Sequence, residues 1–304
     1  MDHISIIVVH YNSEKDTLDC LKSLKNVKTP DFKITTVVID NGSLKNFNLP
    51  GIYKQSNFEL IRSESNLGFT GGNNLGITYA REKYDPDYFL LLNNDTRVDP
   101  DFLNQLYKRA QREEAACLIC PKIYFEKGYE YYSMSYSARD KGKVFWYAGG
   151  SIDWPNLSAH HRGVDEIDRG HFDKQQSSDF CTGCCLLIPR QAIETVGLLD
   201  KNYFLYLEDV DYSLRAKAAG FTLCFEPKSV IWHKNAGSSG GAGEGTSVYY
   251  QSRNRLYFAF KYAPFKIKLT AFKMLLEKLL EGDKYERKAS LDLIFARMGK
   301  QTII

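Results

Sequence analysis

Acidic and amide side chains follow one long apolar run in the middle of the chain. The run from Tyr88 to Leu92 ends in Asn93-Asn94-Asp95, and such a run is typical of a strand buried on both faces of a parallel sheet. Asp95 is therefore expected at the carboxyl end of a strand, where open α/β sheets bind their ligands. A carboxylate there suits a ligand or a metal ion better than it suits packing.

A second acidic cluster contains Glu208, Asp209 and Asp211. The apolar spacing up to Ala218 and the stop at Gly220 predict a helix whose first turn holds all three acids. The helix dipole favours acids in that turn for structural reasons alone. Three carboxylates within four residues exceed what capping requires, so we expect at least one of them to be functional.

One histidine, His233, follows the apolar segment 221–232, which predicts a strand or a pair of strands broken at Pro227. A single histidine is more often structural than functional. Its place at a strand end, beside the glycine-rich segment 237–245, favours function here. That segment is expected to be mobile unless a ligand orders it.

The elements that must position these residues alternate between strand and helix. Strand, helix and strand with a short return form a right-handed parallel unit, so Asp40 should leave the sheet at the same edge as Asn12 and Asp95. From residue 121 to about 179 the alternation stops, which indicates an insertion or a substrate-facing subdomain. The predicted strands are 4–9, 34–39, 59–62, 88–92 and 145–152, with a further apolar run at 180–188.

A glycine-rich motif runs from Asn66 to Asn74 and contains Gly68, Gly71 and Gly72. Glycines that let the backbone come close to a ligand, placed before a helix, suit an anionic or nucleotide ligand. The alternative is a tight loop without a ligand. The motif is not the dinucleotide-binding fingerprint, because that fingerprint must follow the first strand.

Composition limits the class of protein. The chain has 304 residues, 43% hydrophobic and 25% charged, with a net charge of +3, which is too small to predict a nucleic-acid binder. The basic excess lies in the C-terminal tail. The sequence has neither an apolar stretch of the roughly 20 residues that cross a bilayer nor a signal peptide, so we expect a cytoplasmic location.

Seven cysteines at uneven spacing fit a reducing compartment. Cys117 with Cys120 and Cys181 with Cys184 form Cys-x-x-Cys pairs that could serve as zinc half-sites. We favour a structural interpretation, because most of these residues lie in apolar runs, where a free cysteine behaves as a small buried hydrophobe.

Together these motifs resemble the inverting family-2 glycosyltransferases of the GT-A type, most closely their rhamnosyltransferase-like branch. The resemblance implies an α/β fold with a Rossmann-like, mostly parallel central sheet flanked by helices, an acceptor-side insertion and a C-terminal helical tail. It divides the chain into a catalytic domain at 1–260, with a nucleotide-sugar half (1–120) and an acceptor half (121–260), and a tail at 261–304. The matching motifs are 8–12, 38–43, 66–74, 92–95, 204–211 and 232–233, in the family's order.

The resemblance also implies residue roles. Asp95 and His233 would bind Mg²⁺ or Mn²⁺, with Asn93 in place of the family's first acid, and Asp209 would be the general base, with Glu208 and Asp211 as alternatives. The reaction needs charge neutralised on the leaving diphosphate and a carboxylate that takes the acceptor's proton. The expected nucleotide-sugar contacts are Tyr11, Asn12, Asp40, Asn66, Gly71, Asn74, Asn93, Asn94, Arg253 and Arg255.

The implied reaction transfers a sugar from dTDP-rhamnose or a UDP-sugar to a hydroxyl of a glycan or lipid-linked acceptor, in cell-surface polysaccharide assembly. Two alternatives remain at this stage. A nucleotidyltransferase uses a similar sheet, but it would want a glycine-rich basic loop after the first strand. A non-catalytic carbohydrate-binding or scaffold protein would have no use for Asp40, Asp95 and Asp209 on one edge.

The tail carries an apolar stripe along a predicted helix. With its lysines, the stripe predicts a helix on the inner membrane surface, and the alternative is packing on the chain's own domain or on a second subunit of a homo-oligomer. The glycine-rich segment 237–245 is predicted to close over the bound diphosphate. The stripe consists of Leu269, Phe272, Leu275, Leu276, Leu279 and Leu280, and the lysines are Lys266, Lys268, Lys273 and Lys278.

Overall fold

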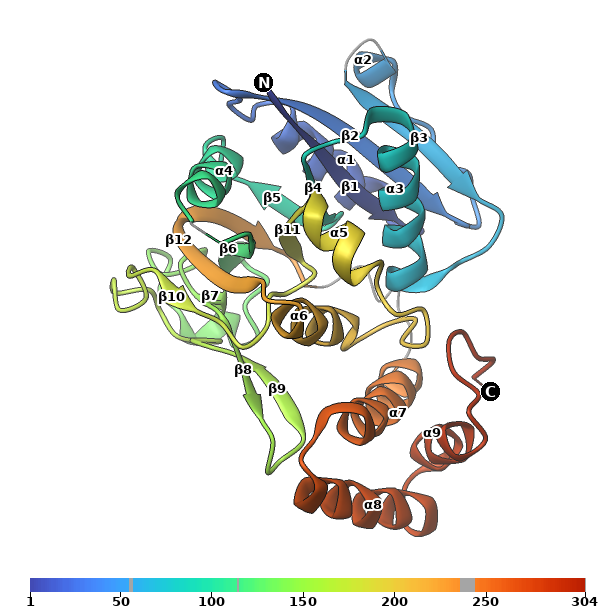
Figure 1. The fold of residues 1–304 in the computed structure, drawn as a ribbon. Coiled ribbons are helices and arrows are strands. Elements are labelled where there is room, and N and C mark those ends of the chain that lie inside the picture. The colour runs from blue at the N-terminus through green and yellow to red at the C-terminus, as the bar shows by residue number, and fades with distance from the viewer. Residues whose placement is uncertain (55–56, 114, 236–243, 304) are drawn as a thin grey trace.

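The structure, a computed structural model, describes residues 1–54, 57–113, 115–235 and 244–303. Within these residues a ten-stranded mixed sheet runs in the order β10-β12-β6-β11-β4-β1-β2-β3, with β5 beside β12 and β7 beside β6. Figure 1 shows the sheet and its helices. The strands are β1 Asp2–His10, β2 Phe32–Asn41, β3 Phe58–Ser63, β4 Tyr88–Asn93, β5 Thr96–Val98, β6 Cys117–Phe125, β7 Phe145–Tyr147, β8 Gly150–Asp153, β9 Ser158–His161, β10 Gln176–Ser177, β11 Cys185–Pro189 and β12 Thr222–His233.

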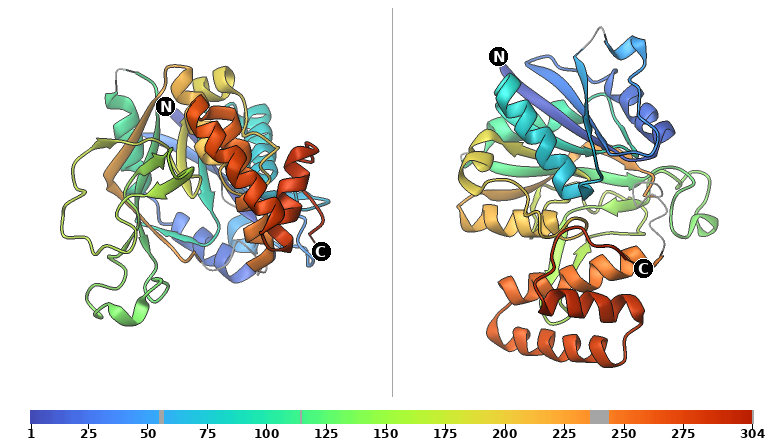
Figure 2. Two further views of the ribbon diagram at one scale, coloured as in Figure 1. Left: turned by 90° about the horizontal axis from the view of Figure 1, so that it is seen from below. Right: turned by 90° about the vertical axis from the view of Figure 1, so that its right-hand side faces the viewer.

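The helices cover both faces of the sheet. In Figure 2, α3, α5 and α6 lie on one face and α1 on the other. Burial on both sides explains why β1 and β4 are continuous apolar runs, with side chains such as Ile6, Ile7, Leu90 and Leu91 fully buried. The helices are α1 Glu14–Leu24, α2 Gly51–Lys54, α3 Gly68–Tyr84, α4 Phe102–Arg112, α5 Arg190–Val196, α6 Glu208–Ala218, α7 Glu244–Tyr262, α8 Phe265–Leu280 and α9 Lys284–Ile294.

The parallel half of the sheet aligns the strand ends that the sequence predicted to meet. Strand β1 pairs in parallel with β2 and β4, with His10 opposite Asp40 and Val9 opposite Asn93. The carboxyl ends of these strands therefore lie at one edge. The predicted run 180–188 becomes β11, which enters antiparallel between β4 and β6.

Two predictions about elements need correction, and for a third the structure decides between two alternatives. Segment 145–152 is two strands, because Gly149 has φ of +104° and turns the chain between β7 and β8. Segment 221–232, predicted to be one strand or a pair, is one strand, β12, with an irregular register between Glu226 and Val230, where Pro227 lacks the N–H needed for regular pairing. The glycines of 66–74 lie inside α3 and not in a loop before it.

The C-terminal helices form a unit with its own small core. Helix α7 begins at residue 244 and crosses the predicted boundary at 260, so the helical region starts earlier than the change in charge suggested. Within the described residues, none of the helices is both long and apolar enough to cross a membrane. The core of the unit consists of Leu256, Ala259, Ala263, Ala271 and Leu275, together with Leu157 from the insertion.

The insertion reaches toward this unit through the β8–β9 hairpin, which extends from the sheet to the C-terminal helices (Figure 1). Trp154 at its tip stacks on Phe258 of α7, with ring centroids 5.6 Å apart and planes 4° from parallel. The hairpin and α7 thus form one continuous wall.

Candidate active site

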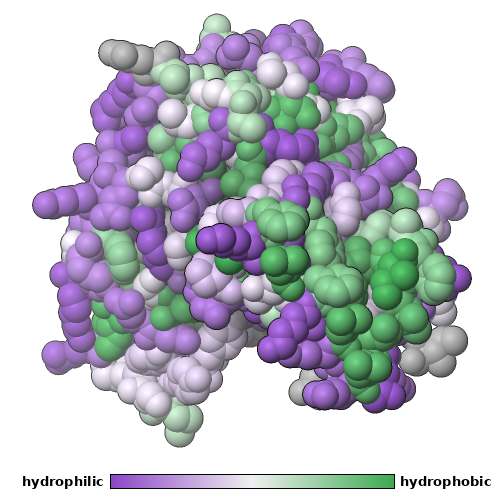
Figure 3. Space-filling view, turned by 60° about the horizontal axis from the view of Figure 1, so that its bottom comes forward, coloured by the Kyte–Doolittle hydropathy of each residue, from purple (hydrophilic) through white to green (hydrophobic). Residues whose placement is uncertain are grey.

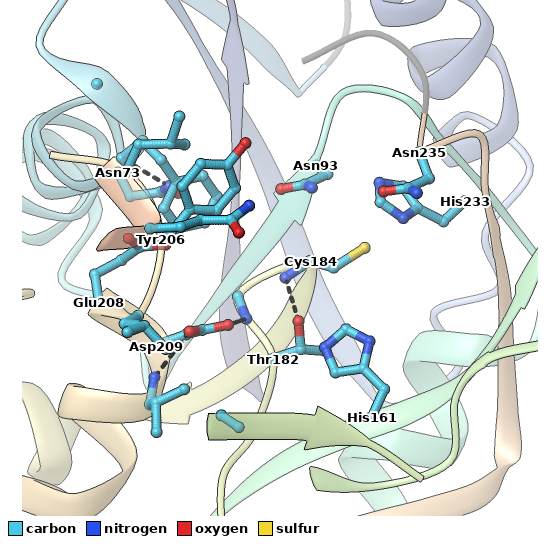
Figure 4. A pocket seen from close by; sticks show the side chains of 18 of the residues that line it. Asn73, Asn93, His161, Thr182, Cys184, Tyr206, Glu208, Asp209, His233 and Asn235 are labelled. Carbon is cyan, nitrogen blue, oxygen red and sulfur yellow. Dashed lines mark hydrogen bonds between the residues drawn. The ribbon is translucent and has the colours of Figure 1, made fainter. Parts of the chain in front are cut away.

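A cleft of about 910 Å³ opens at the carboxyl edge of the sheet. Strand ends, the turn before β11, the start of α6 and the middle of α7 all contribute to it, as Figure 4 shows for its centre. Its size suits a ligand as large as a nucleotide-sugar. Of the predicted site residues, those that line it are Tyr11, Asn66, Asn93, Asn94, Glu208, Asp209, His233 and Arg255.

Asp95 and His233 form a buried pair beside the cleft. The His233 Nε2–H donates to Asp95 Oδ1 at 3.0 Å, and both residues are almost fully buried. The pairing of β12 with β5 brings them together, because it sets His233 opposite Thr96. Two predicted metal ligands from distant parts of the sequence therefore meet at one strand end.

The pair fits a hard divalent cation. Asp95 Oδ2 and His233 Nδ1 are buried and have no hydrogen-bond partner among the described residues, and orphaned polar atoms of this kind call for an explanation. The open atoms are thus a carboxylate oxygen and an imidazole nitrogen, ligands that Mg²⁺ or Mn²⁺ can accept. No cluster of three or more potential ligands occurs in the described part of the chain, so phosphate and water would have to complete the shell.

Asp209 projects from the first turn of α6 to the other side of the cleft. Its Oδ2 accepts from the N–H of Gly183 and its Oδ1 from that of Val210, each at 2.8 Å. Burial raises the pKa of Asp209, although these N–H groups oppose the shift. The carboxylate is thus fixed in direction and more basic than an ordinary aspartate.

Glu208 lies next to Asp209 but is almost completely buried. Its Oε2 has no partner among the described residues. Burial, reinforced by the charge of Asp209, raises the pKa of Glu208 well above its usual range. Glu208 therefore borders the cleft as an acid that ionises less readily than an ordinary glutamate.

Asp211 is corrected from a catalytic to a structural residue. It is fully buried, and its carboxylate accepts from Arg215 at 2.7 Å, Lys261 at 2.7 Å and Tyr262 at 2.6 Å. Because Asp211 is fully buried and does not line the cleft, no acceptor hydroxyl could reach it. Its contacts instead join α6 to the end of α7.

Arg253 also lies outside the cleft, contrary to the prediction that it meets the diphosphate. It is fully buried, and its guanidinium donates to the carbonyls of Asn202, Tyr203, Arg297 and Gly299. These carbonyls occupy the donors that a phosphate would need. Arg255 is the arginine of α7 that lines the cleft, where it also donates to the carbonyls of Leu157 and Asn156.

Four residues that were predicted to contact the nucleotide-sugar do not line the cleft and instead contact other parts of the protein. Asp40 is fully buried and accepts from the N–H groups of Ser43 and Phe47 and from Arg62. Burial opposes its ionisation, but these donors outweigh burial and hold the pKa of Asp40 below its usual value. In this conformation Asp40 shapes the loop after β2 and does not face the cleft.

The other three are structural for local reasons. Asn12 has φ of +57° and accepts from the N–H of Leu44 at 2.9 Å. Asn74 bonds both the N–H and the carbonyl of Leu199, at 3.0 and 2.9 Å. Gly71 lies in the first turns of α3 against Leu67. They shape the surroundings of the cleft without lining it.

The structure adds residues that sequence reasoning missed. His161 faces the cleft near Thr182 (Figure 4), its Nδ1 donates to the carbonyl of Trp146 at 3.1 Å, and burial lowers its pKa to about 4. Trp146 lies between His161 and His233, with ring centroids 4.3 and 4.4 Å away. The adjacent pair His160-His161 was the available signal, in a region without any recognisable motif.

A mixed sheet with aligned strand ends, a cleft at that edge and carboxylates around it define an α/β protein that binds a ligand outside the carboxyl ends of its strands. Residues 5–197 match the model of Glycosyl transferase family 2. This match covers more than half of the chain, and the chain belongs to that family.

Two relatives illustrate the family. A low-salt glycan biosynthesis hexosyltransferase, Agl10, of Haloferax volcanii is 27% identical over 71% of this chain and 62% of its own length. An N-acetylglucosaminyl-diphospho-decaprenol L-rhamnosyltransferase of Mycobacterium tuberculosis is 26% identical over 68% of each chain. The chain thus spans about three fifths to two thirds of the length of these relatives.

Solved structures agree on the fold. GalNAc-T7 with UDP, GalNAc and Mn²⁺ has a TM-score of 0.59 at 14% identity, over 98% of this chain and 59% of the other. The mannosyltransferase PcManGT of Pyrobaculum calidifontis, in complex with GDP-Man and Mn²⁺, has a TM-score of 0.52 at 11% identity, over 98% and 76% of the two chains. These likenesses confirm the predicted GT-A type of α/β fold.

Proposed function

We propose that the chain is an inverting glycosyltransferase that moves a sugar from a nucleotide-diphosphate donor to a hydroxyl of a glycan or lipid-linked acceptor. The observation that carries the proposal is one cleft with His233 on one side and Asp209 on the other (Figure 4), where His233 is hydrogen-bonded to the buried Asp95. We propose dTDP-rhamnose or a UDP-sugar as the donor, and cell-surface polysaccharide assembly at the cytoplasmic face of a membrane as the setting. The names of the relatives support this choice.

In this reaction, side chains of the protein accept the proton of the acceptor hydroxyl and orient the reacting groups. The acceptor oxygen forms a bond to the anomeric carbon while the bond from that carbon to the diphosphate breaks, and Asp209 takes the acceptor's proton. Attack from the face opposite the leaving group inverts the anomeric centre. Asp95 and His233 would hold Mg²⁺ or Mn²⁺, which when bound would supply positive charge for the leaving diphosphate.

A transfer assay with each candidate donor, with Mn²⁺ and with excess EDTA, tests this proposal. We expect EDTA to abolish turnover and Asp95→Asn and His233→Ala to lower it by at least about 100-fold, because uncompensated charge on the leaving group raises the barrier by several kcal/mol. His171→Ala, an exposed histidine outside the cleft, is the matched control and should leave turnover unchanged.

Donor binding gives an independent measurement. A donor with metal at 100 times its Kd should stabilise the protein by about 2.7 kcal/mol and raise its Tm. Full turnover in excess EDTA, together with wild-type rates in both ligand variants, would refute the metal requirement.

A further inference from the structure

One face of α8 exposes a row of large apolar side chains. Their exposed fractions range from 42% to 75%, which is unusual for several such residues on one helix. At 100° per residue they fall within an arc of about 80°, while Ala271 and Leu275 point into the C-terminal core. This row, called the α8 stripe below, consists of Phe265, Leu269, Phe272, Leu276 and Leu280.

Lysines flank the α8 stripe on both sides. By helical spacing, Lys268 lies at one border and Lys266 and Lys273 at the other. Neither Lys266 nor Lys268 forms an ion pair with any residue that the structure describes, and Lys273 meets only the exposed Glu277, at 3.6 Å. Both borders of the stripe therefore carry positive charge.

The surface continues onto α9. Arg287 donates to the carbonyl of Leu280, which joins the end of the stripe to a face where Leu291, Ile294 and Phe295 are exposed. Figure 3 shows apolar side chains gathered over the C-terminal helices, with charged ones around them. At 16 residues, α8 is about 24 Å long, so the α8 stripe is long and narrow.

Charge decides between two occupants of this surface. A two-fold contact with a second copy would place the same patch against itself, so the lysine borders of the two copies would lie close together and repel. An anionic lipid surface attracts both borders while its interface accepts the apolar row. Such a lipid surface therefore satisfies the whole pattern.

We propose that the α8 stripe and the adjoining face of α9 dock the protein on an anionic bilayer surface, with α8 lying parallel to the membrane plane. This deepens the proposed function, and it rests on that function only for the membrane location of the acceptor. The chemistry of docking is independent of catalysis, so the two can fail separately.

Co-sedimentation with phosphatidylcholine vesicles, with and without phosphatidylglycerol, tests the docking. The wild-type protein should pellet with the anionic vesicles. Leu269→Glu with Leu276→Glu should lower the partition coefficient at least tenfold for each leucine removed from the bilayer. Leu44→Glu, at a leucine that is 93% exposed in the loop after β2, is the control and should bind like the wild type.

A second pair of variants tests the charge. Lys266→Gln with Lys268→Gln should weaken binding to anionic vesicles by on the order of 25-fold and leave binding to neutral vesicles unchanged. These side chains are not in the core, and circular dichroism melting of every variant checks that the fold is kept. Donor hydrolysis measured without vesicles should equal that of the wild type in all of them.

Three results would overturn the proposal. One is wild-type protein that stays in the supernatant with anionic vesicles. Another is a leucine double variant that still pellets, which would assign binding to another surface. The third is a dimer in sedimentation velocity that the leucine variants dissociate while vesicle binding is absent, which would make a second copy the occupant.

Discussion

The carboxylate of Asp209 is fixed by two backbone N–H groups, from Gly183 and Val210. This arrangement orients the base before a substrate arrives, and it belongs to the turn before β11 as much as to α6. Asp95 is already paired with His233, and Asp211 accepts from two cations, Arg215 and Lys261, and from the hydroxyl of Tyr262. Asp209 is therefore the acid of the cleft that suits proton transfer best.

Asp209→Asn should lower turnover by about 10² to 10⁴ while donor affinity stays near that of the wild type, because removal of a general base affects the transition state and not donor binding. Initial rates and donor titration measure the two quantities. The matched control is Asp179→Asn, an exposed aspartate that also accepts from a backbone N–H. Turnover within a few-fold of the wild type would rule out Asp209 as the base.

The same residue sets the pH dependence. Because burial raises the pKa of Asp209, the base is protonated at a higher pH than an ordinary aspartate, whose pKa is about 3.9. The rate should therefore fall as the pH decreases through the raised pKa and reach a plateau above it. A pH profile of kcat/KM shows this acid limb directly.

The apolar pattern marks the element boundaries at which Asp95, His233 and the acids of α6 stand, so their places in the fold could be predicted from the sequence. The choice of Asp209 among those acids came from the family resemblance, and the roles of all three residues stay predictions. It could not predict the fate of Arg253. An arginine on a helix is exposed by default, and only the tertiary fold shows that four carbonyls surround this one. The loss of Asp40 from the cleft has a similar cause, since its partners Phe47 and Arg62 come from separate segments.

At the scale of elements, the glycines of α3 serve packing. A Cβ added at Gly76 would lie 2.4 Å from Ile7 Cγ2, and one at Gly72 would lie 2.8 Å from Val9 Cγ1. The absence of side chains thus lets α3 approach β1 closely. The motif predicted a ligand-binding loop because a glycine-rich sequence is typical both of such loops and of helices packed closely on a strand. The strand that α3 contacts, β1, is far away in the sequence, so the sequence alone could not distinguish the two.

Gly76→Ala should destabilise the fold by a net of about 1 kcal/mol, since overpacking at 1–3 kcal/mol exceeds the gain in helix propensity of about 1 kcal/mol. Urea unfolding measures this difference. Gly51→Ala in α2, where a Cβ meets nothing within 4 Å, should cost nothing. A Gly76→Ala protein as stable as the wild type would show that the helix can move away from the sheet freely.

At the scale of the whole molecule, α7 supports the loop that leads into α6, whose first turn holds Glu208 and Asp209. Asn254 Nδ2 donates to the carbonyls of Tyr203, Leu205 and Tyr206, at 2.9, 2.7 and 3.0 Å. The same loop holds three non-glycine residues at positive φ, Phe204, Tyr206 and Leu207. Backbone of this kind persists only where its surroundings fix it.

Asn254→Ala should therefore lower kcat more than it weakens donor binding, and should cost roughly 2 kcal/mol or more of unfolding free energy through the unpaired carbonyls. Rates, donor titration and urea unfolding separate the effects. Asn57→Ala, which removes an exposed amide that donates to the carbonyl of Ile34, serves as the comparison. A stability loss with unchanged kcat would leave Asn254 without a positioning role.

The domain boundary predicted at 260 was placed where the basic excess begins, at residue 261. Helix α7 begins at 244 and runs across that boundary, and its sequence mixes apolar and polar residues without a change in charge at its start. A change in charge reflects the solvent-facing residues of the C-terminal helices. The contacts that join these helices to the rest of the chain are formed by buried residues on both sides of the predicted boundary, and charge does not reveal them. The segment 237–245, predicted to close over the diphosphate, lies largely outside the described residues, and that prediction stands as made.

The support that α7 gives to the loop before α6 has a consequence for the order of synthesis. Chains leave the ribosome amino end first, so Glu208 and Asp209 emerge before Arg253 and Asn254, and before Arg297 and Gly299, whose carbonyls hold Arg253 in place. The sheet can form while the loop at 202–207 still lacks its partners. A nascent chain that stops short of α7 should thus carry a folded sheet and a turn before α6 that nothing yet holds in place, and we expect activity only after the last helices have docked.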